Sequence, residues 1–255
     1  MIQVQNVTKT YSLTKKQKKE LQTNTGSISA VNNVSFTCEP GKVFSLLGPN
    51  GAGKTSLLRM MATILKPTSG DILISSKSVK ENPIETRSSI GFLTGSTNLY
   101  EKLTPTEIVL YFGKLYGLEK NVISDRMNLL FDKLQIHEYS QKRIGQLSTG
   151  MKQKVSIARS MIHDPQVVIF DEPTSGLDVI SAHSIIELIR DCKKEGKTVI
   201  FSSHIMSEVD LLCDDLAIIA HGNLIYNDSL ENYRNLSQNK SLTELFIEIV
   251  NTSKK

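Results

Sequence analysis

The sequence lacks long hydrophobic runs. No apolar stretch in its 255 residues approaches the roughly 18 residues that a helix needs to cross a bilayer. The N-terminus also lacks the charged-then-apolar pattern of a signal peptide. Charged residues make up 22% and hydrophobic residues 39% of the chain, as in ordinary globular proteins. We therefore expect a cytoplasmic protein with a full hydrophobic core.

Cysteine is scarce and widely spaced. The three cysteines are Cys38, Cys192 and Cys213, and no C-x-x-C pair is present. This number and spacing argue against a zinc site. We expect reduced, mostly buried thiols in a reducing compartment.

Basic residues interleaved with aromatic ones, which would favour nucleic acid, are also missing. The net charge is +4, and four lysines crowd one short polar stretch at positions 15, 16, 18 and 19. This stretch has no aromatic partner residues and is followed by more polar residues. We interpret it as a solvated loop and expect no nucleic-acid partner.

What the sequence does contain is a complete G-x-x-x-x-G-K-[ST] phosphate-binding motif between an apolar run and an amphipathic one. Glycines let backbone N–H groups turn inward onto phosphates at the start of a helix. The lysine adds a positive charge for the β- and γ-phosphates, and the Thr55 hydroxyl can ligate Mg²⁺. The expected phosphate-binding residues are Gly48, Pro49, Asn50, Gly51, Ala52, Gly53, Lys54, Thr55 and Ser56.

The motif lies among α/β patterns. Segments 2–7, 31–38 and 71–75 are expected to be strands of a small antiparallel sheet. From about 94 to 165 the pattern is helical, with a capping box and Pro105 opening one helix, a second helix over 122–134 and a third from Ser148.

A second α/β stretch follows. Residues 167–170 are continuously apolar, as in a strand buried on both faces. A helix over 180–194 and a strand over 198–203 complete a βαβ unit, and residues 221–223 predict a hairpin turn. The last 25 or so residues are polar and weakly patterned, with one helix expected over 242–250.

Triphosphate hydrolysis needs a metal carboxylate, a group that activates water and a sensor of the γ-phosphate. Asp171 ends a buried strand and is expected to hold Mg²⁺, while Glu172 is placed to act as general base. His204 ends the next strand and is expected to contact the γ-phosphate and orient Glu172. The alternatives are a solvated turn for the acidic pair and a helix cap for the histidine.

Four motifs together resemble the ATP-binding subunits of ATP-binding cassette (ABC) transporters. They are the phosphate loop, Leu-Ser-Thr-Gly-Met at 147–151, Phe-Asp-Glu-Pro-Thr-Ser-Gly-Leu-Asp at 170–178 and Ser-Ser-His at 202–204. The resemblance covers residues 1 to about 225. Residues 99–104 and the form of the 147–151 signature resemble the drug- and sodium-exporting branch.

The resemblance implies a fold and a division into domains. It predicts an α/β P-loop NTPase core with a mainly parallel sheet, an antiparallel β subdomain and an inserted helical subdomain at about 95–165. Residues 1–230 would form the ATP-binding domain, and residues 231–255 would form a short C-terminal tail.

The resemblance also implies site residues and partners. Tyr11 would stack on adenine, although a tyrosine that only packs at a strand end is the alternative. The signature residues would contact the ATP held by a second ATP-binding subunit, and a homodimer is expected. A membrane permease would dock near residues 94–104 at the inner face of the cell membrane. The signature residues are Ser148, Thr149, Gly150 and Met151.

Two departures from the family pattern leave alternatives open. Gly95 stands where the family has a metal-contacting glutamine, so Ser96, Thr94 or a water would substitute for it. Thr149 and Met151 replace the common glycine and glutamine of the signature. Both fit the exporting branch, and a degenerate, non-hydrolysing site is the competing interpretation.

The expected function is therefore an ATPase that drives an ABC exporter with ATP and Mg²⁺. One alternative is a soluble ABC-type ATPase acting on ribosomes or nucleic acid, although such proteins usually have two cassettes or coiled-coil insertions. The other is a small-molecule kinase, which would lack the signature and His204.

Overall fold

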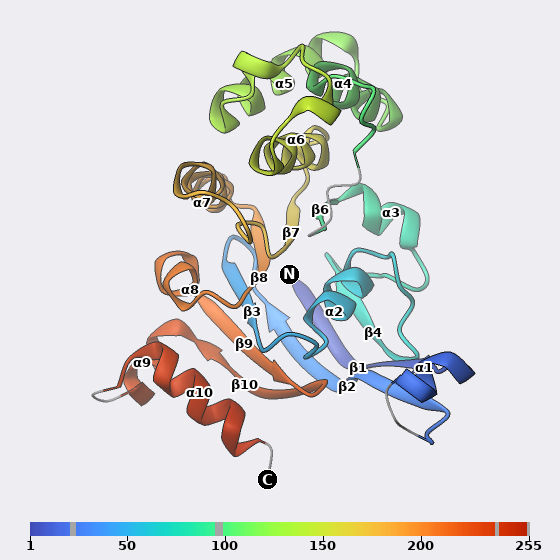
Figure 1. Ribbon diagram of the computed structural model, residues 1–255, viewed down its shortest axis with the longest axis vertical. Coiled ribbons are helices and arrows are strands. Elements are labelled where there is room, and N and C mark those ends of the chain that lie inside the picture. The colour runs from blue at the N-terminus through green and yellow to red at the C-terminus, as the bar shows by residue number, and fades with distance from the viewer. Residues whose placement is uncertain (21–23, 95–98, 238–239, 254–255) are drawn as a thin grey trace.

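A six-stranded, mainly parallel sheet forms the centre of the molecule (Figure 1). The computed structural model describes residues 1–20, 24–94, 99–237 and 240–253. Within them, every neighbouring pair in this sheet is parallel except β9 and β10. Its strands, in spatial order, are β10 (Asn223–Ser229), β9 (Asp215–Ala220), β3 (Val43–Leu47), β8 (Thr198–Ser203), β7 (Val167–Asp171) and β6 (Ile90–Leu93).

A four-stranded antiparallel sheet lies beside it, as the sequence predicted. Its strands, in spatial order, are β2 (Ser27–Cys38), β1 (Ile2–Ser12), β4 (Ser69–Ile74) and β5 (Lys77–Ser78). The prediction of a loop for the lysine-rich stretch was wrong, because it contains a short helix, α1 (Lys15–Glu20). Lysine, glutamine and glutamate are good helix formers, and Lys16 and Glu20 approach at i,i+4.

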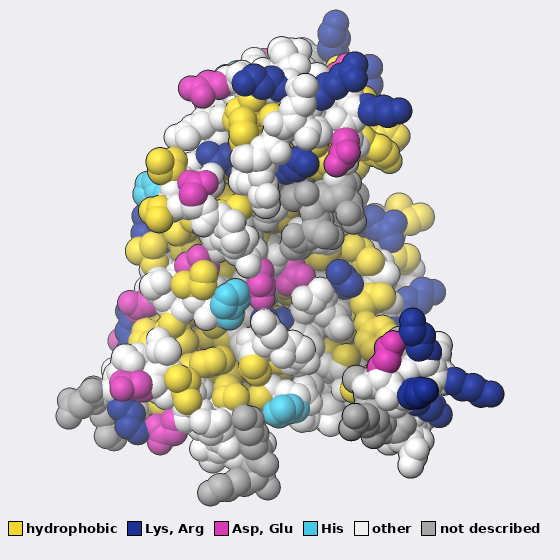
Figure 2. All heavy atoms as spheres, viewed as in Figure 1, with side chains coloured by type: hydrophobic (Ala, Val, Ile, Leu, Met, Phe, Trp, Pro, Cys, Tyr) yellow, Lys and Arg dark blue, Asp and Glu magenta, His cyan; other side chains and the backbone are white. Residues whose placement is uncertain are grey.

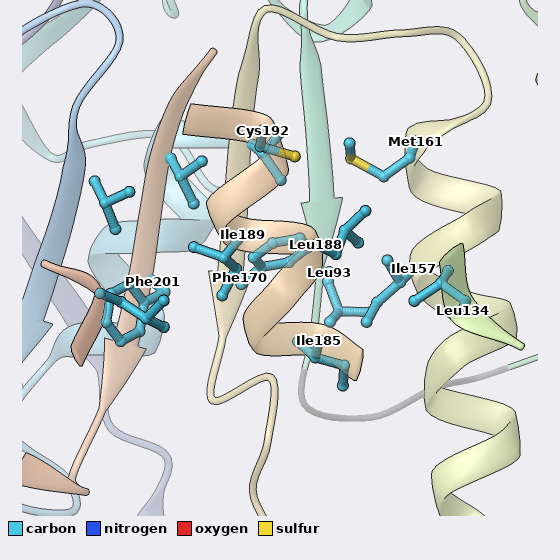
Figure 3. Packing of buried hydrophobic residues seen from close by; sticks show 14 of the residues in the cluster. Leu93, Leu134, Ile157, Met161, Phe170, Ile185, Leu188, Ile189, Cys192 and Phe201 are labelled. Atoms are coloured by element: carbon cyan, nitrogen blue, oxygen red, sulfur yellow. The ribbon is translucent and has the colours of Figure 1, made fainter. Parts of the chain in front are cut away.

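The central sheet is buried on both faces because two hydrophobic clusters enclose it. Phe44 and Ile169 belong to the cluster shared with helix α2 (Lys54–Met61) and the antiparallel sheet. Phe170 and Phe201 belong to the other cluster, into which α7 (Val179–Lys194) packs (Figure 3). The alternation along each strand places the phosphate-loop helix on one face and α7 on the other.

Three helices form the subdomain at the top of Figure 1. They are α4 (Pro105–Leu115), α5 (Lys120–Leu134) and α6 (Thr149–Met161). The predicted capping box of α4 is confirmed, since the Thr104 hydroxyl accepts from the Glu107 N–H at 3.2 Å and the Glu107 carboxylate accepts from the Thr104 N–H at 2.8 Å. The shorter elements are α3 (Pro83–Ser88), α8 (Met206–Leu212) and 3₁₀ turns at His137–Tyr139 and Ile144–Gln146.

Two helices follow the β9–β10 hairpin. The expected helix near the C-terminus is confirmed as α10 (Leu242–Thr252), whereas α9 (Leu230–Ser237) was not expected. Tyr233 on α9 is fully buried, and its hydroxyl donates to the Leu242 carbonyl at 3.1 Å. No helix in the described ranges combines the length and apolar character that a bilayer crossing demands.

The three cysteines are free and buried, as expected. Burial raises the pKa of the Cys192 and Cys213 thiols to about 12 and raises the pKa of Cys38 well above its ordinary value. The reactive thiolate is therefore scarce near neutral pH.

We predict that a thiol-specific disulfide reagent at neutral pH will label the native chain far more slowly than the same chain in denaturant. Denaturation removes the burial that holds the protons on sulfur, so all three thiols should then react. Absorbance of the released reagent measures both rates. Rapid labelling of any cysteine in the native chain would contradict the burial described above.

Candidate nucleotide-binding site

The phosphate-binding motif forms a tight loop between β3 and α2. Two of its glycines are required by close approaches to backbone oxygens. A Cβ at Gly53, whose φ is +108°, would lie 2.1 Å from the Ala30 oxygen, and one at Gly48 would lie 2.1 Å from the Ile219 oxygen. A cavity of about 190 Å³ opens here, lined by Ala30, Gly51, Ala52, Gly53, Lys54, Thr55, Ser56 and Glu172.

Lys54 places a buried positive charge in this loop. Its side chain is 5% exposed, and its Nζ donates to the Gly48 carbonyl at 2.6 Å and to the Pro49 carbonyl at 3.2 Å. Burial lowers its pKa, while the negative charges of Glu172 and Asp171 oppose that shift. A buried cation among backbone N–H groups at a helix start fits an anionic phosphate.

Thr55 and Asp171 come together as the sequence predicted. Asp171 is the last residue of β7 and is buried, and its Oδ1 accepts from the Thr55 hydroxyl at 3.1 Å. The Ser202 hydroxyl donates to the same oxygen at 2.8 Å. Among the described residues, no group of three or more His, Cys, Asp or Glu side chains could hold a metal ion. One carboxylate and one hydroxyl beside a phosphate loop suit Mg²⁺, which retains waters and uses substrate phosphates as ligands.

Glu172 adopts an unusual backbone conformation. Its φ is +50°, in the left-handed region, which costs a non-glycine residue about 1 to 3 kcal/mol. Its Oε1 lies 3.9 Å from Lys54 Nζ and 3.5 Å from His204 Nδ1. In Figure 2, acidic side chains lie close to a histidine at the centre of the viewed face. The left-handed turn thus accompanies a Glu172 carboxylate that lies close to both Lys54 and the predicted partner His204.

His204 lies in the loop between β8 and α8 with about half of its side chain exposed. His204 does not cap the following helix. The N-cap of α8 is Ile205, which makes no side-chain capping bond. An exposed imidazole beside Glu172 can exchange hydrogen bonds with both the carboxylate and a ligand.

Tyr11 lies near the end of β1 and beside the phosphate loop. Its hydroxyl is 3.2 Å from the Ser56 hydroxyl, and Lys9 Nζ lies 5.2 Å from the centre of its ring. The predicted adenine-stacking residue is therefore adjacent to the loop, at the end of a strand.

The signature residues belong to a different part of the chain. Ser148 is the N-cap of α6 and accepts from the Met151 N–H at 3.3 Å, while Thr149 begins the helix. Gly150 is packed so closely against α7 that a Cβ there would lie 2.8 Å from the Ser181 hydroxyl. None of these four residues lines the phosphate-loop cavity, and Figure 1 shows α6 apart from α2.

Two sets of hydrogen bonds that stabilise the site were not predicted from the sequence. Ser202 contacts Asp171, as described above, and also accepts from the Glu172 N–H at 3.0 Å. The β9–β10 turn lies against the phosphate loop, where the Gly222 N–H donates to the Ala52 carbonyl at 3.0 Å. The Ser-Ser-His run was a signal for the first contact, but no local pattern indicates the second. Gly95 and Ser96 lie outside the described residues.

Comparisons with known proteins agree with the predicted resemblance. A family model described as ABC transporter matches residues 31–175. The chain is 43% identical over 221 residues to the ABC transporter ATP-binding protein NatA of Bacillus subtilis, covering 86% of this chain and 90% of that protein. It is 38% identical over 197 residues to the Nod factor export ATP-binding protein I of a Rhizobium species, covering 77% of this chain and 65% of that protein.

Solved structures are similar over nearly the whole chain. An ATP-binding subunit of an ABC transporter superposes with a TM-score of 0.84 at 25% identity, covering 98% of this chain and 99% of that one. A dimeric cassette, MJ0796, in a post-hydrolysis state with ADP and Pi gives 0.79 at 25% identity, covering 90% and 99%. The chain therefore belongs to the ABC transporter family, as one of its ATP-binding, ATP-hydrolysing subunits.

Proposed function

We propose that this chain powers export through a separate membrane permease, by closing in pairs on ATP and hydrolysing it. The observation that carries this proposal is the separation of the phosphate loop from the signature at the start of α6. Two identical copies arranged head to tail would bring each signature to the other copy's nucleotide. The names of the relatives, which include a Nod factor export protein, support export.

The residues of the loop would bind ATP in defined roles. Lys54 and the loop N–H groups would hold the phosphates, and Tyr11 would stack on adenine. Thr55 and Asp171 would hold Mg²⁺, which when bound would neutralise phosphate charge. Glu172 would accept a proton from the attacking water while His204 orients its carboxylate. The proximity of these groups argues against a degenerate site despite Gly95.

An apolar surface supports pairing of two copies. Val179 and Ile180 begin α7 and are 85% and 73% exposed. Asp178 caps this helix by accepting from the Ser181 N–H at 2.9 Å, and Ser181 packs on Gly150 of the signature. The pairing surface and the signature would therefore move together. Ser148, Thr149, Gly150 and Met151 would present the helix N-terminus to the partner's γ-phosphate.

A surface between α3 and α4 fits the docking of a permease. Two neighbouring cavities of about 290 and 300 Å³ share Arg87, Phe112 and Tyr116. Ile84 and Leu115 line the first and are 79% and 62% exposed. Figure 2 shows hydrophobic side chains on the right-hand side of the molecule, where Figure 1 places α3 and α4. We propose that a permease segment fills this groove and holds the chain at the inner face of the membrane.

We predict that Glu172→Gln will keep ATP binding but lower turnover about 100-fold or more, because the amide cannot accept the proton of water. Blocked turnover should also trap an ATP-bound dimer. Released phosphate and size-exclusion chromatography with ATP and magnesium measure the two effects. Unchanged turnover in this variant would remove Glu172 from the proposed role, and a persistent monomer would contradict pairing.

We predict that Lys54→Ala will weaken ATP binding about 30-fold or more, since a charge that pairs with phosphate is removed. The matched control is Lys77→Ala, which removes an exposed lysine paired with Glu85. Equilibrium binding of ATP should be normal in the control. If both variants bind ATP as the wild type does, the role of Lys54 is wrong.

We predict that the double variant Ile84→Glu and Leu115→Glu will lower the amount of membrane protein that co-purifies with the chain about 10-fold. The reason is that two negative charges would replace the apolar rim of the groove. Leu211→Glu on α8, which is 51% exposed and outside the groove, is the control. ATP binding should survive in both. Recovery of ribosomes or nucleic acid at high salt, in place of a membrane protein, would favour the soluble alternative.

A further inference from the structure

We propose that Ser202 is a positioning residue for ATP hydrolysis, through a single buried hydroxyl that holds both Asp171 and Glu172. This inference rests on the proposed roles of those two carboxylates. It assigns to the chain a residue outside the phosphate loop that orients the metal-binding group and the base together.

The register of the central sheet brings Ser202 to this place. Strands β7 and β8 are parallel, and Asp171 pairs with Ser202. Ser202 is fully buried. Its hydroxyl donates to Asp171 Oδ1 at 2.8 Å and accepts from the Glu172 N–H at 3.0 Å. A serine hydroxyl has one proton and two lone pairs, so one group can make both bonds at once.

The first bond fixes the carboxylate of Asp171. Oδ1 accepts from Thr55 at 3.1 Å as well as from Ser202 at 2.8 Å. Two donors on one oxygen restrict rotation of the carboxylate and so set the direction of its other oxygen. Groups that orient a metal ligand in this way commonly govern metal affinity and activity.

The second bond holds the backbone at Glu172. This residue has a φ of +50°, and its N–H is satisfied by the Ser202 hydroxyl. Removing the hydroxyl would leave that N–H without this acceptor and would relax the backbone from which the Glu172 side chain extends toward Lys54 and His204. One substitution would therefore disturb both carboxylates.

The neighbouring serine has a different task. The Ser203 hydroxyl donates to Glu208 Oε2 at 2.9 Å and accepts from the Ile205 N–H at 3.0 Å, so it organises the loop that carries His204. Of these two serines, only Ser202 makes a hydrogen bond to Asp171 or Glu172 among the described residues. The two serines are thus not interchangeable.

The test uses Ser202→Ala together with a matched pair, Ser202→Thr and Ser202→Val. Threonine and valine have nearly the same shape, but only threonine keeps the hydroxyl. Ser45→Ala is the control for loss of a buried hydroxyl, because Ser45 lies in β3 of the same sheet and its Oγ has no hydrogen-bond partner in the described structure.

We expect Ser202→Ala and Ser202→Val to lower kcat about 10- to 100-fold with little change in KM for ATP. Ser202→Thr and Ser45→Ala should retain most of the wild-type kcat. A second measurement does not depend on turnover. In the Glu172→Gln background, magnesium should increase the affinity for ATP, and Ser202→Ala should reduce that increase about 10-fold while ATP binding in chelator stays unchanged.

Two results would overturn the role of Ser202 while leaving the proposed function intact. One is a Ser202→Ala variant with wild-type kcat and wild-type magnesium dependence. The other is equal impairment of the threonine and valine variants, which would mean that packing matters and the hydroxyl does not. A wild-type chain without ATPase activity, or full activity in Glu172→Gln, would instead overturn the proposed function and this inference with it.

Discussion

The parallel pairing of β3, β7 and β8 is the constraint on which the site depends. Because these strands run in the same direction, their carboxyl ends meet at one edge of the sheet. The phosphate loop leaves β3 at this edge, Asp171 ends β7 and Ser203 ends β8. Residues that are distant in the chain thereby lie within hydrogen-bonding or ion-pairing distance of one another beside the phosphate loop.

Two oppositely charged side chains, Lys54 and Asp171, are buried at this edge of the sheet. Lys54 and Asp171 are each about 5% exposed, and buried charges are tolerated only where partners satisfy them. Backbone carbonyls satisfy Lys54, and two hydroxyls satisfy Asp171. Such a preorganised set of charges interacts with phosphate more strongly than exposed groups would in water.

The signature is linked to this edge through packing between helices. Gln153 of α6 donates to the Pro173 carbonyl at 3.2 Å, immediately after the acidic pair, and Gly150 packs on α7. The helical subdomain is therefore hydrogen-bonded to the residue that follows Glu172. In the proposed pair, this contact would connect the hydrolysis site of one copy with the signature that it presents to the other.

Helices α1 and α9, which the sequence analysis did not predict, are both short. Helix α1 consists almost wholly of charged residues, and α9 is a mostly polar helix with Leu230 and Tyr233 buried. Helix α1 contains no apolar residue, and α9 is too short to repeat its apolar spacing over several turns. The intrinsic helix propensity of its residues accounts for α1, whereas burial of Leu230 and Tyr233 against the rest of the fold stabilises α9.

Local signals determined much of this protein from the sequence alone. The phosphate loop, the capping box at Thr104 and the buried strand before Asp171 are each encoded within a few neighbouring residues, because backbone geometry and side-chain periodicity act over short distances. The tertiary structure alone decided that the Ser202 hydroxyl meets Glu172, 30 residues away, and that Gly222 supports Ala52. Those contacts depend on strand order and register, which arise only when the whole sheet is assembled.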